Sequence, residues 1–189
     1  NSLDEHLIRD LLMQGPKIDS FGVGVQLITS KSSPVFGGVY KLVAVENHRG
    51  EIIPKIKVSE NTAKITNPHF KKLYRYYDKK SGKALADELC LWNETVDPKE
   101  PHTIFDPNAV WKTKTLTDFA VRELQVPIFK NGCCVYTLPA LKDIQSYCAQ
   151  QVESLWDEVK RFENPHTYYV DLSNRLWTIK NQLLAGVKQ

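Results

Sequence analysis

The N-terminal part of the sequence orders its predicted elements in a way that few folds share. Apolar side chains recur at helical spacing over residues 3–12, and Gly15-Pro16 ends that pattern. An extended segment over residues 17–21 leads directly into Gly22 and Gly24. Helix, tight turn, strand and glycine loop in this order indicate a β/α repeat, in which ligands bind at the carboxyl ends of the strands. The glycine loop is therefore a candidate binding site.

Three helices are predicted in all. The first begins with Ser2-Leu3-Asp4-Glu5, which matches the S-x-x-E capping box and makes Ser2 the expected N-cap. The second follows Pro139 and covers residues 141–159, where apolar side chains keep helical spacing. The third lies at the end of the sequence and is expected to be capped by Asp171 or Ser173.

The middle of the chain is predicted to consist of antiparallel strands. β-Branched and aromatic residues gather there in short segments, which are separated by turns rich in Gly, Pro, Asn and Asp. The predicted strands cover residues 39–45, 53–58, 72–77, 84–92 and 124–129. We therefore expect an α/β part at residues 1–66 and a β-rich α+β domain at residues 67–189.

Positive charge is concentrated in one part of the chain. Nine basic residues lie between Lys55 and Lys83, against Glu60 and Asp78 as the acidic ones, whereas the whole chain has a net charge of only +3. Such a block indicates an anionic partner, such as a phosphate-bearing small molecule, a nucleic acid or a membrane surface. A solvated lysine-rich face would give the same composition, and both interpretations remain open on charge alone.

Composition indicates a soluble chain in the cytoplasm. No apolar run approaches the ~18–20 residues that a membrane helix needs, and the polar, acidic start does not resemble a signal peptide. The four cysteines form no CxxC pair, so we expect reduced thiols and predict no metal site. Because the sequence lacks an initiator Met, we expect a fragment or a processed piece of a longer protein.

The glycine loop, residues 21–25, has two interpretations when it is considered alone. Gly22 and Gly24 can let the backbone approach a ligand closely and turn successive amide groups toward a phosphate. The same spacing also suits a tight β-to-α turn without a ligand. The loop lacks the third glycine of the dinucleotide fingerprint and the Lys-Ser/Thr of a P-loop, so it matches neither motif.

The sequence around this loop resembles that of nicotinate phosphoribosyltransferases, which are type II phosphoribosyltransferases. The similarity is collinear and extends over essentially the whole chain, which makes it far more specific than a glycine pair. It is carried by residues 18–30, 37–43, 57–61, 64–66, 74–75, 77–78, 104–107 and 164–173.

The resemblance implies an enzyme of NAD salvage. This family condenses nicotinate with phosphoribosyl pyrophosphate to give nicotinate mononucleotide and pyrophosphate, with coupled ATP hydrolysis and Mg²⁺, and is classed as a ligase or glycosyltransferase. The implied fold is the last β/α units of an irregular phosphoribosyltransferase-type α/β barrel, followed by the α+β C-terminal domain. A homodimer is implied as well. The catalytic residues are expected upstream, in the N-terminal part of the same enzyme, so this fragment alone should be inactive.

The resemblance also assigns roles to particular residues. Gly22, Val23, Gly24 and Val25 match the loop that receives the 5′-phosphate. The family usually has Thr where this chain has Val25, so we expect contacts through backbone amides only. Lys57 and Lys64 are the candidates for contacting ATP or pyrophosphate. Ser2 lies in a segment that resembles the family's sequence near the phosphoribosyl group. It is therefore also a candidate for a ligand contact, in addition to its expected role as a helix cap.

Two alternatives remain at this point. The chain could be a non-catalytic, phosphate-binding accessory module, or it could belong to the relatives that use nicotinamide. The residues that choose between the acid and the amide are expected outside this chain. A nucleic-acid partner is disfavoured, because no recognition helix or aromatic pair accompanies the charges.

Overall fold

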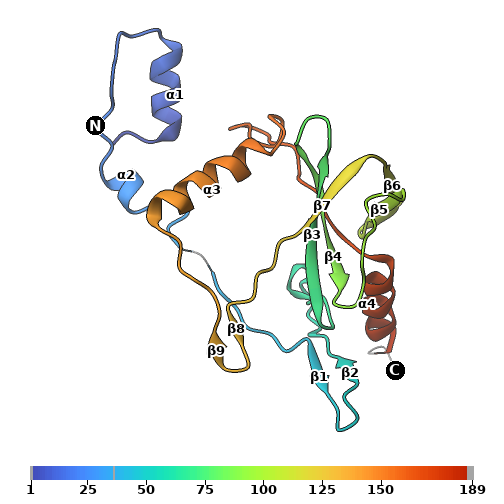
Figure 1. Ribbon diagram of the computed structural model, residues 1–189. Coiled ribbons are helices and arrows are strands. Elements are labelled where there is room, and N and C mark those ends of the chain that lie inside the picture. Colours follow the sequence, from blue (N-terminus) through green and yellow to red (C-terminus); the bar gives the residue numbers. More distant parts are fainter. Residues whose placement is uncertain (1, 36, 187–189) are drawn as a thin grey trace. The chain divides into compact units, whose positions relative to one another are not determined.

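The computed structural model describes residues 2–35 and 37–186 (Figure 1). By their contacts the residues divide into two compact units, Asn1–Tyr40 and Lys41–Gln189. The domain boundary predicted between residues 66 and 67 lies inside the second unit and stays a prediction. No helix of the described residues is both long enough and apolar enough to span a membrane.

The first unit contains helices α1, Glu5–Met13, and α2, Val25–Ile28. The predicted capping box is wrong: Asp4 is the N-cap of α1, and its Oδ1 accepts a hydrogen bond of 2.8 Å from the Leu7 amide. A carboxylate at this position also interacts favourably with the helix dipole, which a serine hydroxyl cannot match. The predicted end is confirmed, because Gly15 takes a left-handed φ of +70° and its N–H donates to the Leu12 carbonyl.

The extended segment predicted at residues 17–21 forms no strand in the structure. A strand needs a neighbour to accept and donate its backbone hydrogen bonds, and the described residues of this unit form no other strand. The prediction of a β/α repeat is therefore not realised within these residues alone.

A four-stranded sheet organises the second unit, in the order β10-β4-β3-β7. Strand β3 pairs antiparallel with both β4 and β7, and β10 pairs parallel with β4. In Figure 1 the green strands β3 and β4 lie at the centre of this sheet, with the red helix α4 beside β4. The four strands are β3, Lys71–Asp78; β4, Ala84–Leu91; β7, Phe119–Glu123; and β10, Val170–Leu172.

The remaining elements form small hairpins and helices. They are β1, Ala44–Glu46; β2, Ile52–Pro54; the 3-10 helix η1, Thr62–Lys64; β5, His102–Asp106; β6, Ala109–Leu116; β8, Phe129–Lys130; β9, Cys133–Cys134; α3, Leu141–Glu153; and α4, Asn174–Gly186. The three hairpins β1-β2, β5-β6 and β8-β9 are all antiparallel.

Two hydrophobic clusters hold the second unit together. In the first, Tyr76 and Phe119 are fully buried and their rings meet edge to face with centroids 5.5 Å apart. In the second, Leu176 of α4 packs against the sheet. Ser173 caps this helix, since its Oγ accepts a hydrogen bond of 3.2 Å from the Leu176 amide. Of the two predicted caps, Ser173 is confirmed and Asp171 is wrong.

The predicted mixture of helices with antiparallel strands is confirmed, although several boundaries differ. Strands at residues 72–77 and 84–92 correspond to β3 and β4. The strand predicted at 124–129 is wrong, because the sheet strand β7 ends at Glu123. The β5-β6 hairpin was not predicted. Helix α3 ends at Glu153, before the predicted end at Val159.

Candidate functional site

The glycine loop lies directly before α2 in the first unit. Gly24 is the N-cap of that helix, with φ −101° and ψ −114°, and no side chain caps it. The amides of Leu27 and Ile28 both donate to the Gly24 carbonyl. Intrahelical bonding therefore leaves the preceding amides, among them that of Val25, available for an external acceptor.

Neither glycine of this loop is needed to avoid a clash within the described chain. A Cβ added at Gly22 or Gly24 would meet no atom within 4 Å, and neither residue has a positive φ. Nearby, the side-chain oxygen of Gln26 is shielded from solvent and has no hydrogen-bond partner among the described residues. An open glycine pair beside an unsatisfied acceptor suits the close approach of another group, from a ligand or from elsewhere in the protein.

Lys57 and Lys64 lie on one loop of the second unit. The Lys57 amide donates to Thr66 Oγ1 at 3.0 Å, and the Thr66 amide donates back to the Lys57 carbonyl at 3.4 Å. Lys64 closes the short helix η1 just before that contact. Both side chains are exposed. The structure thus brings the two lysines onto the same loop, separate from the unit that contains the glycine loop.

Charge alone left the basic block open between an anionic partner and a solvated face, and the structure shows that much of the block has partners inside the domain. Arg75 pairs with Asp87, Lys79 with Asp118 at 3.3 Å and Lys83 with Glu153 at 3.2 Å. Lys71 donates to the His69 carbonyl at 2.6 Å, and Lys72 Nζ lies 4.0 Å from Glu123 and 5.2 Å from the centre of the Tyr74 ring. The positive charges of these side chains are therefore paired with groups inside the domain. Among the described residues, no hydrogen bond or ion pair engages the side chains of Lys55, Lys57, Lys64 and Lys80.

Arg75 belongs to a half-buried ionic cluster. Its guanidinium donates to both oxygens of Asp87, at 2.7 and 2.8 Å, and Tyr168 donates its hydroxyl to Asp87 Oδ1 at 2.8 Å. The hydrogen bonds to Asp87 raise the pKa of Arg75, and burial raises the pKa of the Tyr168 hydroxyl. The cluster joins β3 and β4 to the segment before β10, so its role is structural.

A second polar cluster lies on the opposite face of the sheet. The buried Glu88 carboxylate accepts hydrogen bonds from the Tyr76 hydroxyl and from His102 Nε2, the latter at 2.8 Å. Cys90 Sγ lies 3.5 Å from the same carboxylate oxygen. Burial is the main cause that raises the pKa of Tyr76 and of Cys90, so both stay protonated. A protonated, buried thiol is inert, and this cluster offers no nucleophile.

Asp171 is a buried carboxyl group that makes stability depend on pH. It lies in register with Glu88 of the neighbouring strand. Burial, followed by the charges of Asp106 and Glu88, raises the pKa of Asp171 from 3.8 to about 6. Between these values the folded protein holds a proton that the unfolded chain has lost, so stability falls as pH rises from about 4 to 6.5.

Replacing Asp171 by asparagine is expected to remove this slope. The wild-type protein should lose at most about 3 kcal/mol of unfolding free energy over that pH range from this group. Urea unfolding at pH 4.5, 5.5 and 6.5 measures the difference between wild type and Asp171→Asn. Parallel pH dependences for the two proteins would show that Asp171 titrates normally.

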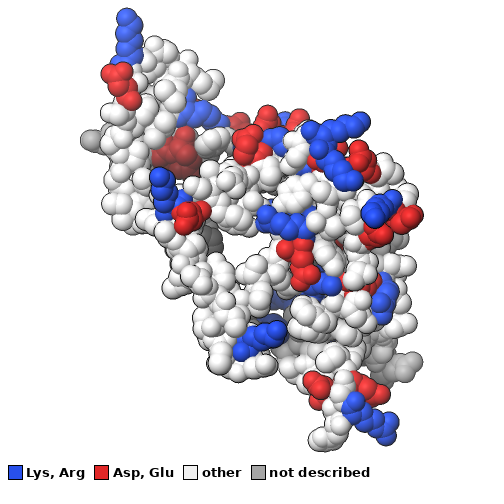
Figure 2. All heavy atoms as spheres, in the orientation of Figure 1, with Lys and Arg blue, Asp and Glu red and all other residues white. Residues whose placement is uncertain are grey.

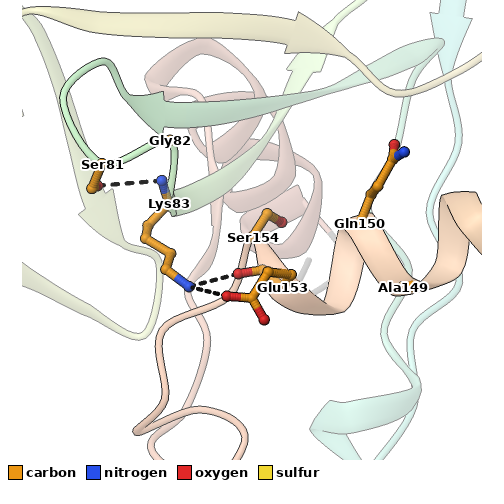
Figure 3. Close-up of a pocket in the computed structure, with 7 residues that line it drawn as sticks. All are labelled: Ser81, Gly82, Lys83, Ala149, Gln150, Glu153 and Ser154. Carbon is orange, nitrogen blue, oxygen red and sulfur yellow. Dashed lines mark hydrogen bonds and ion pairs between the residues drawn. The ribbon is translucent and has the colours of Figure 1, made fainter.

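A cavity of about 500 Å³ beside Lys83 in the second unit does not resemble a catalytic site. Figure 3 shows that Lys83 points toward the C-terminal end of α3. The Lys83 ammonium already donates to the Glu153 carbonyl, to Glu153 Oε1 and to the Leu155 carbonyl. An ammonium has only three donors, so none is left for a ligand. Lys83 instead neutralises the negative end of the helix dipole.

Sequence reasoning missed these internal partners, although part of the signal was present. Alternation along β3 places Arg75 on the face opposite to Tyr74 and Tyr76. The hairpin register then sets Arg75 directly opposite Asp87. The positive φ of Gly82 marks the turn of that hairpin, but a β-bulge between Tyr76 and Tyr77 shifts the register, so counting from the turn alone would have set Arg75 opposite Ala86.

Comparisons with known proteins bear on the whole chain. The family model described as the nicotinate phosphoribosyltransferase C-terminal domain matches residues 70–180. The nicotinate phosphoribosyltransferase of Bacillus subtilis is 38% identical over 188 residues, which cover 100% of this chain and 38% of the relative. That of Dictyostelium discoideum is 32% identical, over 99% of this chain and 32% of the relative. The chain therefore spans about a third of the length of the curated relatives it matches.

One solved structure shows the same fold. The crystal structure of human nicotinic acid phosphoribosyltransferase matches with a TM-score of 0.70 and 24% identity, over 97% of this chain and 32% of that chain. At this identity the likeness concerns the fold.

Proposed function

The chain belongs to the nicotinate phosphoribosyltransferase family and corresponds to its C-terminal part, and we propose that it completes an enzyme that joins nicotinate to phosphoribosyl pyrophosphate. The products are nicotinate mononucleotide and pyrophosphate. The observation that carries the proposal is the match to the Bacillus subtilis relative along the full chain at 38% identity. The catalytic residues belong to the longer protein, upstream of these residues.

In this proposal the glycine loop holds the 5′-phosphate of the substrate and product. The free amides before α2, including that of Val25, donate to phosphate oxygens, while Gly22 and Gly24 leave room for them. Displacement at the anomeric carbon passes through a transition state with oxocarbenium character. Anchoring the phosphate keeps that carbon in place, which is a contribution of positioning. Residues 1–66 then complete the last β/α units of the barrel, and residues 67–189 form the C-terminal domain.

ATP and Mg²⁺ enter the proposal differently. Lys57 and Lys64 are available to contact the phosphates of ATP or the pyrophosphate group, because no hydrogen bond or ion pair with described residues engages their ammonium groups. The described residues contain no cluster of His, Cys, Asp and Glu that suits a metal. We therefore assign Mg²⁺ no site among these described residues and derive no step through it. A cytoplasmic homodimer is part of the same proposal.

The experiment that tests the function is an assay of the full-length protein. Pyrophosphate release from phosphoribosyl pyrophosphate is measured with nicotinate and with nicotinamide, each with and without ATP. The proposal expects release with nicotinate that ATP increases, and little release with nicotinamide. Preference for nicotinamide would move the protein to the amide-using relatives. Phosphate binding without turnover would support a non-catalytic accessory module.

Replacing Lys57 by alanine in the full-length protein is expected to weaken ATP dependence. The loss of one charged hydrogen bond should raise the KM for ATP about threefold to tenfold, corresponding to roughly 0.7–1.4 kcal/mol. Lys55→Ala is the matched control, since Lys55 is also exposed but lies outside the segments that resemble the family, residues 57–61 and 64–66. Equal effects of the two substitutions would indicate that Lys57 belongs to a solvated lysine-rich face and contacts no ligand.

A further inference from the structure

One segment of the second unit has no buried residue. Every residue from Gln125 to Gln150 is exposed, and we call this segment the arm. It contains the β8-β9 hairpin and most of α3. The arm starts after β7 and ends where Gln151 of α3 accepts hydrogen bonds from Arg75 and Arg122. Its polypeptide is therefore attached to the sheet at both ends, and near its C-terminal end the Tyr147 hydroxyl also accepts a hydrogen bond of 3.0 Å from Arg122.

The arm is apolar in spite of its exposure. Phe129 is 69% exposed, Leu138 85% and Leu141 70%. Charged residues of the arm are Lys130, Lys142 and Asp143. Figure 2 shows the surface over β8 and β9 as almost free of charged atoms. The other large apolar side chains exposed on the arm are Val126, Ile128, Val135, Tyr136, Ile144 and Tyr147.

The arm cannot be stable through its own contacts. The β8-β9 hairpin is held by only two residue pairs, and α3 buries no side chain. Isolated hairpins and short helices are marginal in water, and most of their stability comes from packing an apolar face. Large apolar patches on the surface of a protein usually mark a face that another surface covers.

We infer that the arm packs against the upstream part of the same polypeptide in the full-length protein. This inference rests on the proposed function, in which the chain is the C-terminal part of a longer enzyme. The relative from Bacillus subtilis, of which this chain covers only 38%, has ample length for such a surface. An upstream part is synthesised first and is covalently attached, so it presents its apolar surface at a high effective concentration when the arm emerges.

Charge and composition argue against other partners. A membrane surface attracts segments with clusters of four or more Lys and Arg, whereas the arm has a single net positive charge from Lys130, Lys142 and Asp143. The same weak charge is unsuited to a nucleic acid. A second copy of the chain would cover the arm only when the protein is concentrated enough to associate, and this dependence separates it from the upstream part.

Cysteine labelling of the full-length protein tests the inference. Cys133, Cys134 and Cys148 lie on the arm and are exposed, whereas Cys90 is buried inside the sheet. The native protein is treated with a maleimide, and the rate at each cysteine is followed by mass spectrometry and compared with that in denaturant. We expect the three arm cysteines to react at least tenfold more slowly in the native protein. Cys90 serves as the control for an intact fold.

Two outcomes would overturn the inference. Arm cysteines that react at the denatured rate while Cys90 is protected would show that nothing covers the arm. Protection that disappears on dilution to monomers, with Cys90 still protected, would assign the arm to an interface between subunits. Protection in a protein without phosphoribosyltransferase activity would contradict the proposed function and leave the packing in place.

A substitution on the arm provides a second test. Ile144 and Cys148 are one helical turn apart on α3, so Ile144→Asp places a charge in the covered face. It should increase labelling of Cys148 at least tenfold while Cys90 stays protected. Ser146→Asp, about half a turn away from Ile144, is the matched control and should leave the rate unchanged. Equal rates in the two variants would contradict the packing of this face.

Discussion

Replacing Arg75 by alanine is expected to lower the free energy of unfolding by about 3–5 kcal/mol. The reason is the position of Asp87, whose side chain is 7% exposed and accepts two hydrogen bonds from Arg75. Without the guanidinium this carboxylate keeps only the Tyr168 hydroxyl as a hydrogen-bonding side chain and remains out of water. Chemical denaturation of the full-length protein, followed by the signal of this domain, measures the loss.

Arg122→Ala is the matched control for this prediction. Arg122 lies directly opposite Arg75 on the neighbouring strand, but it is exposed and its hydrogen bonds go to Tyr147 and Gln151. We expect it to cost less than about 1 kcal/mol. A similar small cost for both arginines would mean that the Arg75–Asp87 pair contributes no more than a surface ion pair.

Under the proposed function, replacing Gly24 by leucine in the full-length protein is expected to raise the KM for phosphoribosyl pyrophosphate tenfold or more. A tenfold change corresponds to ~1.4 kcal/mol, which is within what one charge-assisted hydrogen bond supplies. The side chain would occupy the space through which the phosphate approaches the amides before α2. A Cβ at Gly24 has no neighbour within 4 Å among the described residues, so we expect the thermal midpoint to change little.

Val25→Thr is the informative companion to this substitution. It introduces the hydroxyl that the family resemblance implies at this position and keeps the backbone amide. The KM for phosphoribosyl pyrophosphate should stay the same or fall. Unchanged kinetics for Gly24→Leu would show that the loop is not part of the binding site, whatever the result for Val25→Thr.

The sequence predicted well what local patterns determine. Strand β3 alternates buried and half-buried residues, and such period-2 alternation is read directly from the residues, whereas β4 is buried at most of its positions. The end of α1 at Gly15 follows from the need for a left-handed residue. The cap of the same helix was misplaced, because Ser2 and Asp4 both suit the role and only the backbone geometry chooses between them.

What depends on distant partners was harder to predict. Lys72, Arg75 and Lys83 contribute to a basic block in the sequence, but their acidic partners Glu123, Asp87 and Glu153 come from other elements. A count of charges contains no information on which of them meet. The β5-β6 hairpin escaped prediction for a related reason. The middle residues of β6 are all exposed, so this strand lacks the alternation of apolar and polar residues that marks a half-buried strand.

The order of predicted elements nominated the glycine loop as a site, but its role in binding the 5′-phosphate was predicted from resemblance. Among the described residues, neither a crowding neighbour nor a positive φ explains why positions 22 and 24 are glycines. Their role depends on a ligand and on the rest of the protein, neither of which the residues themselves encode.

A crystal structure of the full-length protein with nicotinate mononucleotide bound would place the phosphate without relying on kinetics. We predict phosphate oxygens within about 2.7–3.2 Å of the backbone amides that precede α2, including that of Val25. A nucleotide whose phosphate lies elsewhere, with no contact to residues 22–25, would contradict the proposal that this chain supplies the phosphate-binding part of the site.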